Sequence, residues 1–425
     1  MEPKDSLSRR SFIRSSTGAT AGLSAFQIVR PEVARGQVKT RLKAGLVGCG
    51  GRGRQAVIDL MKGSQNVELV AMADIFEDKL EGNLKWMKEQ FPQFGDRIKV
   101  DGEHRFMGFE AYKKLVNSDI DIVMLATPPG YRPMHFEAAV EAKKHVFCEK
   151  PFGTDPVGVR RFIAAAKKSE ELKLTVVSGA QRRFQKEYVE VVDKFKSGGF
   201  GDVTGLYAYW VGTPVLQQKE RDPKWGDMTW EHRNWYSYVW ICGDQVVEQH
   251  LHNIDVCNWV MGTHPVKVWA SGGRAWRPNE ELYGNIYDHL SADFEYANGV
   301  HMSSYCRQYP AKLYTNISEE IVGSKGRWDS KSLRGARPVS GNPYEHEHTA
   351  LINSIRGDGP YINHAMTVAE STMTCIMARE AAYSGEEVTW ERIMNSKLDL
   401  QPKEFGYDVK VERTPIPVPG KYKLI

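Results

Sequence analysis

The sequence predicts an α/β protein in two parts: a doubly wound parallel sheet first, then an α+β part with an open, mostly antiparallel sheet. Three observations support this fold class. Gly48, Gly50 and Gly53 form G-x-G-x-x-G between an apolar run and a helix-compatible run. Strand-like and helix-like runs alternate from Arg41 to about Ala180. After that point, strand-like runs follow one another without regular intervening helices, as in an antiparallel sheet.

The first 36 residues differ from the rest of the chain. The segment from Ser8 to Arg14 contains Arg9-Arg10 followed by Phe12-Ile13 and resembles a twin-arginine export signal. The stretch from Ser15 to Val29 is mildly apolar and rich in small residues, like the middle of a signal. We therefore expect residues 1–36 to be a leader and the protein to be periplasmic or otherwise exported. A basic tail on a cytoplasmic protein is the alternative.

The glycine loop lies between a predicted strand, Leu42–Val47, and a predicted helix, Gln55–Met61. In a dinucleotide-binding loop the first glycine allows a tight turn, the second a close approach to pyrophosphate, and the third close packing of helix and strand. The pyrophosphate then lies at the N–H groups of the helix start. A glycine-rich surface turn is the alternative for the glycines alone. The loop residues expected to bind the cofactor are Gly48, Gly50, Gly51, Arg52 and Gly53.

The second predicted strand, Val67–Ala73, ends at Asp74. An acid at this distance from the glycine loop can bind a ribose 2′-hydroxyl and would repel a 2′-phosphate, so it favours NAD over NADP. A helix N-cap is the other role open to Asp74, because a helical segment follows it.

Two more strand ends carry candidate ligand contacts. The apolar run Ile120–Ala126 predicts a strand buried on both faces, and it ends at Thr127-Pro128-Pro129. Val146–Cys148 predicts the next strand, and Glu149-Lys150-Pro151 follows it directly. Ligands of doubly wound sheets bind beyond the carboxyl ends of the strands, so these motifs share one edge with the glycine loop. Helices at 133–143 and 157–168 and a strand at 174–178 complete this part.

Three motifs follow one another along the chain: the glycine loop, then Ala126-Thr127-Pro128 with His135, then Glu149-Lys150-Pro151. Together they resemble the glucose–fructose oxidoreductase/inositol dehydrogenase (Gfo/Idh/MocA) family, from about residue 43 to 392. The resemblance implies an NAD(P)-dependent oxidoreductase acting on a sugar or polyol, with NAD favoured by the strand-end acid. It also implies a Rossmann domain over residues 37–180 and a lysine, Lys150, between nicotinamide and substrate. The further cofactor contacts that we expect are Thr127, Pro128, His135 and Glu149.

We expect a substrate and oligomerisation domain over residues 181–390 and a surface-wrapping tail over 391–425. The resemblance implies that the exposed face of its sheet joins subunits into a dimer or tetramer. The predicted strands are 203–211, 266–271, 290–296 and 300–306, and the predicted helices are 185–196, 345–356 and 366–384. No clean alternation marks the segment 317–328.

The segment Val246–Asp255 corresponds to a family pattern, Asp-x-Gly-x-His-x-x-Asp, that opens a helix. Glu248 stands at its first acid and His250 at its glycine, and both are departures from the pattern. His252 suits the role of base because histidine titrates near neutrality, and Lys150 can stabilise negative charge on the same substrate oxygen. Glu248, four residues before His252, would share its helix face and fix its tautomer. A satisfied core histidine is the alternative for His252, and packing is the alternative for His250.

Tryptophans concentrate between residues 203 and 260, and aromatic faces suit the C–H faces of sugars, although core packing explains some of them. A metal site is a rival interpretation of residues 248–255 and of Glu345–His348, but neither has a zinc spacing, so we expect no metal. The side chains expected to contact substrate are Arg182, Arg183, Trp235, Tyr236, His250, Asp255 and Tyr287.

These features predict an oxidoreductase that moves a hydride between NAD and a secondary hydroxyl. Export as a folded protein would require the NAD to be held tightly. A redox-neutral NAD-dependent glycosidase and a non-catalytic sugar-binding protein remain alternatives. The net charge of +4 without charged blocks argues against nucleic acid as a partner, and no apolar run reaches the roughly 18 residues of a membrane span.

Overall fold

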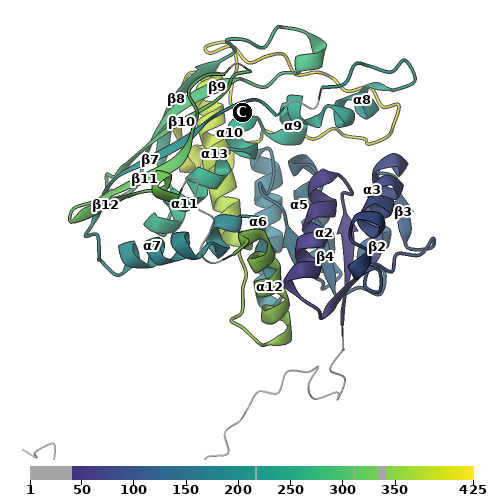
Figure 1. The fold of residues 1–425 in the computed structure, drawn as a ribbon. Coiled ribbons are helices and arrows are strands. Elements are labelled where there is room, and N and C mark those ends of the chain that lie inside the picture. The colour runs from purple at the N-terminus through teal and green to yellow at the C-terminus, as the bar shows by residue number, and fades with distance from the viewer. Residues whose placement is uncertain (1–40, 216–217, 311, 334–340) are drawn as a thin grey trace, which may run out of the picture. The chain divides into compact units, whose positions relative to one another are not determined.

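A computed structural model describes residues 41–215, 218–310, 312–333 and 341–425 of the chain. The predicted leader lies outside the described residues. Arg41–Ile425 form one compact unit, which contains two β-sheets (Figure 1). The predicted fold class is confirmed, because one sheet is parallel and the other is mostly antiparallel.

The first sheet has six parallel strands in the order β3-β2-β1-β4-β5-β6. The side chains of β4 are all buried, as its continuous apolar run predicts for a central strand. The short β3 lacks a sequence signal because it has three half-buried or exposed residues. The strands are β1 (Leu42–Val47), β2 (Val67–Asp74), β3 (Arg105–Met107), β4 (Ile122–Leu125), β5 (His145–Cys148) and β6 (Val176–Ser178).

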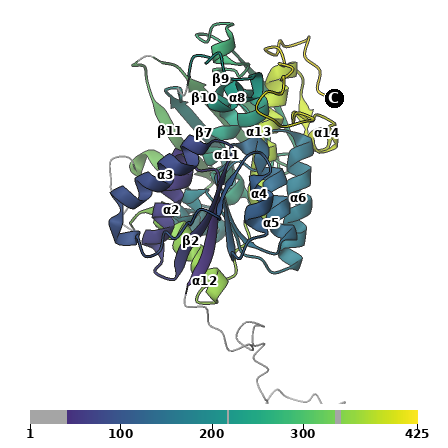
Figure 2. The same ribbon diagram turned by 90° about the vertical axis from the view of Figure 1, so that its right-hand side faces the viewer.

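Helices cover both faces of this sheet, with α2 and α3 on one side and α4, α5 and α6 on the other (Figure 2). A helix from late in the chain, α12 (Pro343–Arg356), packs against α2, where Thr349 Oγ1 donates to the Gly63 carbonyl at 2.8 Å. The second half of the sequence therefore contributes to the cover of the first sheet. The helices from the first half are α2 (Gly51–Gly63), α3 (Glu77–Gln90), η1 (Pro92–Phe94), α4 (Ala111–Val116), η2 (Pro129–Tyr131), α5 (Arg132–Glu141) and α6 (Pro156–Glu171).

The second sheet has seven strands in the order β12-β11-β7-β10-β9-β8-β13, antiparallel except for the parallel pair β7–β10. The segment without clean alternation forms two strands, β11 and β12, joined by Ser324-Lys325. The strands are β7 (Val203–Gly212), β8 (Lys267–Gly273), β9 (His289–Glu295), β10 (His301–Gln308), β11 (Asn316–Gly323), β12 (Gly326–Asp329) and β13 (Val388–Thr389).

One face of the second sheet packs against α11 (Leu251–Met261) and α13 (Ala365–Ser384), and α13 also contacts α6. A continuous hydrophobic core therefore joins the two sheets through these helices. None of the helices in the described residues is both long enough and apolar enough to cross a bilayer. The remaining helices are η3 (Gln181–Phe184), α7 (Lys186–Lys196), α8 (Asp227–Arg233), η4 (Trp235–Ser237), α9 (Val239–Cys242), α10 (Gln245–Glu248), η5 (Glu281–Tyr283), η6 (Ser330–Leu333) and α14 (Trp390–Asn395).

Candidate active site

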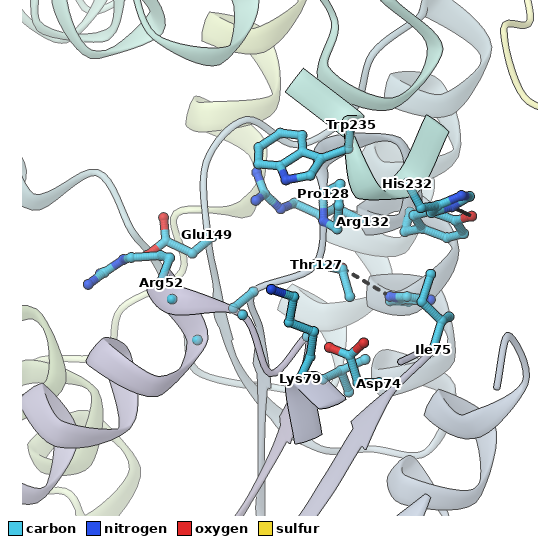
Figure 3. Close-up of a pocket in the computed structure, with 18 of the residues that line it drawn as sticks. Arg52, Asp74, Ile75, Lys79, Thr127, Pro128, Arg132, Glu149, His232 and Trp235 are labelled. Atoms are coloured by element: carbon cyan, nitrogen blue, oxygen red, sulfur yellow. Dashed lines mark hydrogen bonds and ion pairs between the residues drawn. The ribbon is translucent and has the colours of Figure 1, made fainter. Parts of the chain in front are cut away.

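A cavity of about 1130 Å³ lies at the carboxyl ends of the strands of the first sheet, and α8, η4 and α10 contribute to its other wall (Figure 3). Its volume exceeds the roughly 300–1,000 Å³ of pockets for one drug-sized ligand, so a dinucleotide and a small substrate fit together. Every residue predicted to bind the cofactor lines this cavity. The predicted residues on the opposite wall are Trp235, Tyr236, Glu248 and His252.

The glycine loop has the geometry that a dinucleotide requires. Gly48 has φ +92°, a conformation that favours glycine, and a Cβ on Gly53 would lie 2.0 Å from the Gly48 carbonyl oxygen. A Cβ on Gly50 or Gly51 would meet no atom within 4 Å, so the start of α2 faces open space. The free backbone N–H groups there fit a pyrophosphate.

Asp74, at the end of β2, is tied to the glycine loop. Its Oδ2 accepts a hydrogen bond from Cys49 N at 2.6 Å, and its Oδ1 accepts one from Phe76 N at 2.8 Å. Burial raises the pKa of this carboxyl, and the two N–H donors oppose that shift. Asp74 does not cap α3, which follows Phe76 and has no side-chain cap. Asp74 also lines the cavity, and a carboxylate can accept more than these two bonds, so it fits a ribose hydroxyl.

Arg52 is held by three carboxylates at the start of α2. Its Nε donates to Glu149 at 2.5 Å, and its two terminal nitrogens lie 3.3 Å from Asp59 and 3.2 Å from Glu347. Burial raises the pKa of Glu347 well above its usual range, and the neighbouring Glu149 charge adds to the shift. The sequence did not indicate that Glu347 pairs with Arg52. Among the described residues, no group of three or more His, Cys, Asp or Glu side chains is arranged to hold a metal.

Lys150 and Glu248 form a buried pair across the cavity. Lys150 Nζ donates to the backbone carbonyl of Glu248 and to its Oε1, at 3.1 Å. Glu248 Oε2 accepts hydrogen bonds from the Tyr236 hydroxyl and from Gln249 Nε2, at 2.8 Å. Because an ammonium has three donors, one N–H of Lys150 remains for an oxygen in the cavity.

The structure corrects the predicted role of Glu248 toward His252. α10 ends at Glu248 and α11 begins at Leu251, so the two side chains do not share one helix face. The carboxylate is bonded to other groups, and His252 Nδ1 is buried without a partner among the described residues. The imidazole instead stacks on Trp210, with ring centroids 5.8 Å apart. Burial, reinforced by the Lys150 charge, lowers the pKa of His252 well below 6.5, so the ring is neutral near pH 7.

Three charged residues predicted to contact substrate lie in structural ion pairs instead. Arg183 donates to both oxygens of Asp255 at 2.8 Å, which joins η3 to α11. Arg182 pairs with Glu319 on β11. None of these side chains lines the cavity, because each is turned toward its buried partner.

His250 and Tyr287 also lie away from the cavity lining. His250 has no exposed surface, its Nε2 lies 2.7 Å from Ser304 Oγ, and burial lowers its pKa to about 3. The Tyr287 hydroxyl donates to the Pro417 carbonyl at 2.9 Å. Both side chains are buried in the interior of the second half of the chain. Substrate contact by Trp235 and Tyr236 remains a prediction.

The cavity also has lining residues that the sequence did not indicate. Arg132 is the first residue of α5 and follows η2 directly. It is buried near Pro128, which belongs to the strand-end loop already assigned to the ligand edge. The strand-end rule could have identified it, whereas the fold alone reveals the side chain from α12. The polar, aromatic segment 230–236 was expected on the substrate side, and its His232 and Arg233 line the cavity. The additional lining residues include Ile75, Phe76, Lys79, Phe109, Tyr131, Arg132, Gln181, Gln218, Lys219 and Tyr344.

A doubly wound sheet with this glycine loop and this strand-end acid defines a dinucleotide-binding protein, and a second wall completes the cavity. The family model described as "Oxidoreductase family, NAD-binding Rossmann fold" matches residues 42–177. The model described as "GFO/IDH/MocA C-terminal domain" matches residues 188–329. The chain belongs to the GFO/IDH/MocA family, as its motifs predicted, and its cofactor is NAD.

Several curated relatives are inositol dehydrogenases. The myo-inositol 2-dehydrogenase of Thermotoga maritima is 24% identical over 232 residues, which cover 54% of this chain and 58% of the relative. The inositol 2-dehydrogenase of Salmonella typhimurium is 29% identical over 221 residues, covering 52% and 54%. The chain thus spans little more than half the length of these relatives.

Solved structures share the fold. The scyllo-inositol dehydrogenase of Lactobacillus casei, with bound NAD(H) and scyllo-inositol, aligns with a TM-score of 0.63 at 21% identity over 82% of this chain and 99% of that one. GenD2 from gentamicin A biosynthesis, in complex with NAD, aligns with a TM-score of 0.63 at 16% identity over 82% and 96%.

Proposed function

We propose that this protein is an exported NAD-dependent oxidoreductase that moves a hydride between NAD and a secondary hydroxyl of a sugar, polyol or glycoside. The observation that carries the proposal is Lys150, which lies in the cavity with one donor unused and with Glu248 holding its other donors. The relatives named as inositol dehydrogenases support a polyol or sugar as the substrate class.

Bound NAD supplies the hydride acceptor. Lys150 binds the hydroxyl oxygen of the substrate and stabilises the negative charge that develops there during oxidation. His252 lines the same cavity as a neutral ring, so it can accept the hydroxyl proton at neutral pH. Glu248 fixes the position of the Lys150 ammonium, and the indole of Trp235 offers an apolar face to a sugar ring.

We propose that NAD stays bound between turnovers and that the protein is exported with it. Contacts across the ribose end of the cavity support retention: Arg233 on α8 pairs with Asp78, and Tyr407 bonds to the Ile75 carbonyl. Protein purified from a periplasmic fraction should then carry NAD through gel filtration. Recovery of the protein only in the cytoplasm, or free of NAD, would contradict this part of the proposal.

We also propose that the open face of the second sheet joins subunits into a dimer or tetramer. Large side chains with more than a third of their surface exposed lie on this face of strands β7, β8 and β10. Sedimentation of the purified protein would show a monomer if this proposal were wrong. These side chains are Tyr207, Trp269 and Tyr305.

The function is tested with Lys150→Met. Wild-type protein should change nicotinamide absorbance at about 340 nm when a substrate sugar or polyol is added. The variant should keep its NAD but lose turnover by roughly 100-fold or more, because the charge on the substrate oxygen is no longer stabilised. Lys186→Met, on the exposed pair with Glu190, is the matched control. Unchanged turnover in the Lys150 variant would reject the assignment, and release of an aglycone by wild type would identify the glycosidase reaction instead.

A further inference from the structure

Arg132 is a buried arginine in the cavity without an acidic partner. It is the first residue of α5, and 5% of its surface is exposed. Nη1 donates to the Pro151 carbonyl at 2.8 Å, and Nε is buried without a partner among the described residues. Because the side chain also lines the cavity, its guanidinium has unused donors next to ligand space.

The other arginines that line the cavity are neutralised. Arg52 contacts three carboxylates, and Arg233 donates to both oxygens of Asp78. Arg132 forms no ion pair with any carboxylate of the described residues, and burial lowers its pKa. The Glu149 and Glu248 charges act on Arg132 only through space, because those carboxylates pair with Arg52 and Lys150. A buried charge without a directly bonded counter-ion is costly, so a ligand anion fits here.

The position of Arg132 indicates which ligand carries that anion. Its contact with the Pro151 carbonyl places it at the residue next to Lys150, the lysine proposed to bind the reacting oxygen. Figure 3 shows Arg132 near Pro128 and Trp235, away from Asp74 at the ribose end. The pyrophosphate fits the backbone N–H groups at the start of α2, which need no side-chain cation. The unpaired guanidinium therefore lies on the substrate side of the cavity.

We propose that the substrate is acidic: a sugar acid or its glycoside, whose carboxylate is bound by the Arg132 guanidinium while a ring hydroxyl meets Lys150. A planar guanidinium matches a carboxylate with two parallel hydrogen bonds, which a neutral polyol cannot replace. The carboxylate is unchanged in the reaction; the hydride leaves the carbinol carbon for NAD and the proton goes to the base. This inference rests on the proposed oxidoreductase function.

The test compares matched acidic and neutral substrates: glucuronate with glucose, galacturonate with galactose, and the methyl glycosides of each. Wild-type protein should bind at least one acid roughly 30-fold more tightly than its neutral partner, seen as a lower KM and by calorimetry with the NAD-loaded protein. Arg132→Met should remove that preference, mainly through KM, and Arg132→Lys should restore part of it. Arg327→Met, on the exposed far strand β12, is the matched control and should keep the preference.

Three other results of this comparison would each uphold or overturn the inference. Equal affinity for all acidic and neutral partners, or an acid preference that survives in Arg132→Met, would overturn the inference. Loss of NADH binding in Arg132→Met with the acid preference intact would assign the guanidinium to the cofactor phosphates instead. Arg132-dependent binding of an acid without any change in nicotinamide absorbance would uphold the inference and reject the proposed oxidoreductase function.

Discussion

The Lys150 ammonium and the Glu248 carboxylate are each held by more than one contact. Lys150 and Glu248 are 8% and 7% exposed, so water competes little for their hydrogen bonds. A buried pair of this kind is costly to break, because the remaining partner becomes an uncompensated charge. Tyr236 and Gln249 complete the hydrogen bonding of the carboxylate. The precision of the Lys150 position therefore depends on residues that need not touch the substrate.

Tyr236→Phe tests this dependence at the residue scale. The change removes one donor from the Glu248 carboxylate and leaves the aromatic ring, so we expect kcat to fall by roughly tenfold. Binding of NAD should be unchanged, because Tyr236 lies on the wall opposite the glycine loop. The matched control is Tyr238→Phe, whose hydroxyl bonds to the Glu281 carbonyl and does not line the cavity. Equal kcat values for wild type and Tyr236→Phe would show that the tyrosine does not position the pair.

The sequence was informative where a local motif alone determines geometry. The turn at Gly48 and the acid at Asp74 depend on a strand–loop–helix unit that is contiguous in the chain. Prediction from the sequence failed where a residue type suits both a substrate-binding site and a protein core. Arg183 and His250 have the chemistry of substrate ligands, but their direction is fixed by partners far along the chain, Asp255 and Ser304. Those tertiary contacts leave no periodic signal.

At the element scale, α8 and the C-terminal tail cross to the end of β2. Arg233, 14% exposed, donates to both oxygens of Asp78 at 2.8 and 2.6 Å, and its guanidinium lies 3.7 Å from the centre of the Phe76 ring. The Tyr407 hydroxyl donates to the Ile75 carbonyl at 2.5 Å. The tail was predicted only to wrap the surface. Its contact beside the ribose-binding acid required the fold, because no sequence pattern marks a tail that returns to a distant strand.

These crossing contacts predict slow release of the cofactor. Arg233→Ala removes an ion pair and a cation–π contact at the ribose end, so NAD should dissociate roughly tenfold faster. The dissociation rate is measured by displacing bound NADH with excess NAD and following fluorescence. High salt should accelerate release from wild type more than from the variant, because Asp78 is partly exposed and its pair is screened.

The matched control is Arg392→Ala, which removes an exposed ion pair with Glu386 away from the cavity. It should leave the dissociation rate unchanged. If Arg233→Ala also releases NADH at the wild-type rate, the α8 contact does not retain the cofactor.

At the scale of the whole molecule, buried titratable groups make the stability of the folded protein depend on pH. Burial lowers the pKa of six histidines in the described residues, so the folded state keeps them neutral where the unfolded chain protonates them near pH 6.5. Burial also raises the pKa of carboxyls such as Asp74 and Glu347, and this acts in the opposite direction on acidification. The net pH dependence is therefore a sum of opposing contributions. The six histidines are His135, His232, His250, His252, His348 and His364.

His250 allows one of these contributions to be isolated, because it lies outside the cavity lining. Its pKa is about 3 in the folded protein, owing to burial and the Arg182 charge, so below pH 6.5 the unfolded state binds more protons. The contribution of His250 to the free energy of unfolding is fully present above pH 6.5. Below that pH it falls by about 1.4 kcal/mol per pH unit, or about 2 kcal/mol by pH 5. His250→Gln, which can still bond to Ser304, should therefore lose about 2 kcal/mol less than wild type between pH 7.5 and 5 in urea unfolding. The exposed His301→Gln is the control; an identical loss in wild type and His250→Gln would mean that His250 becomes protonated without unfolding.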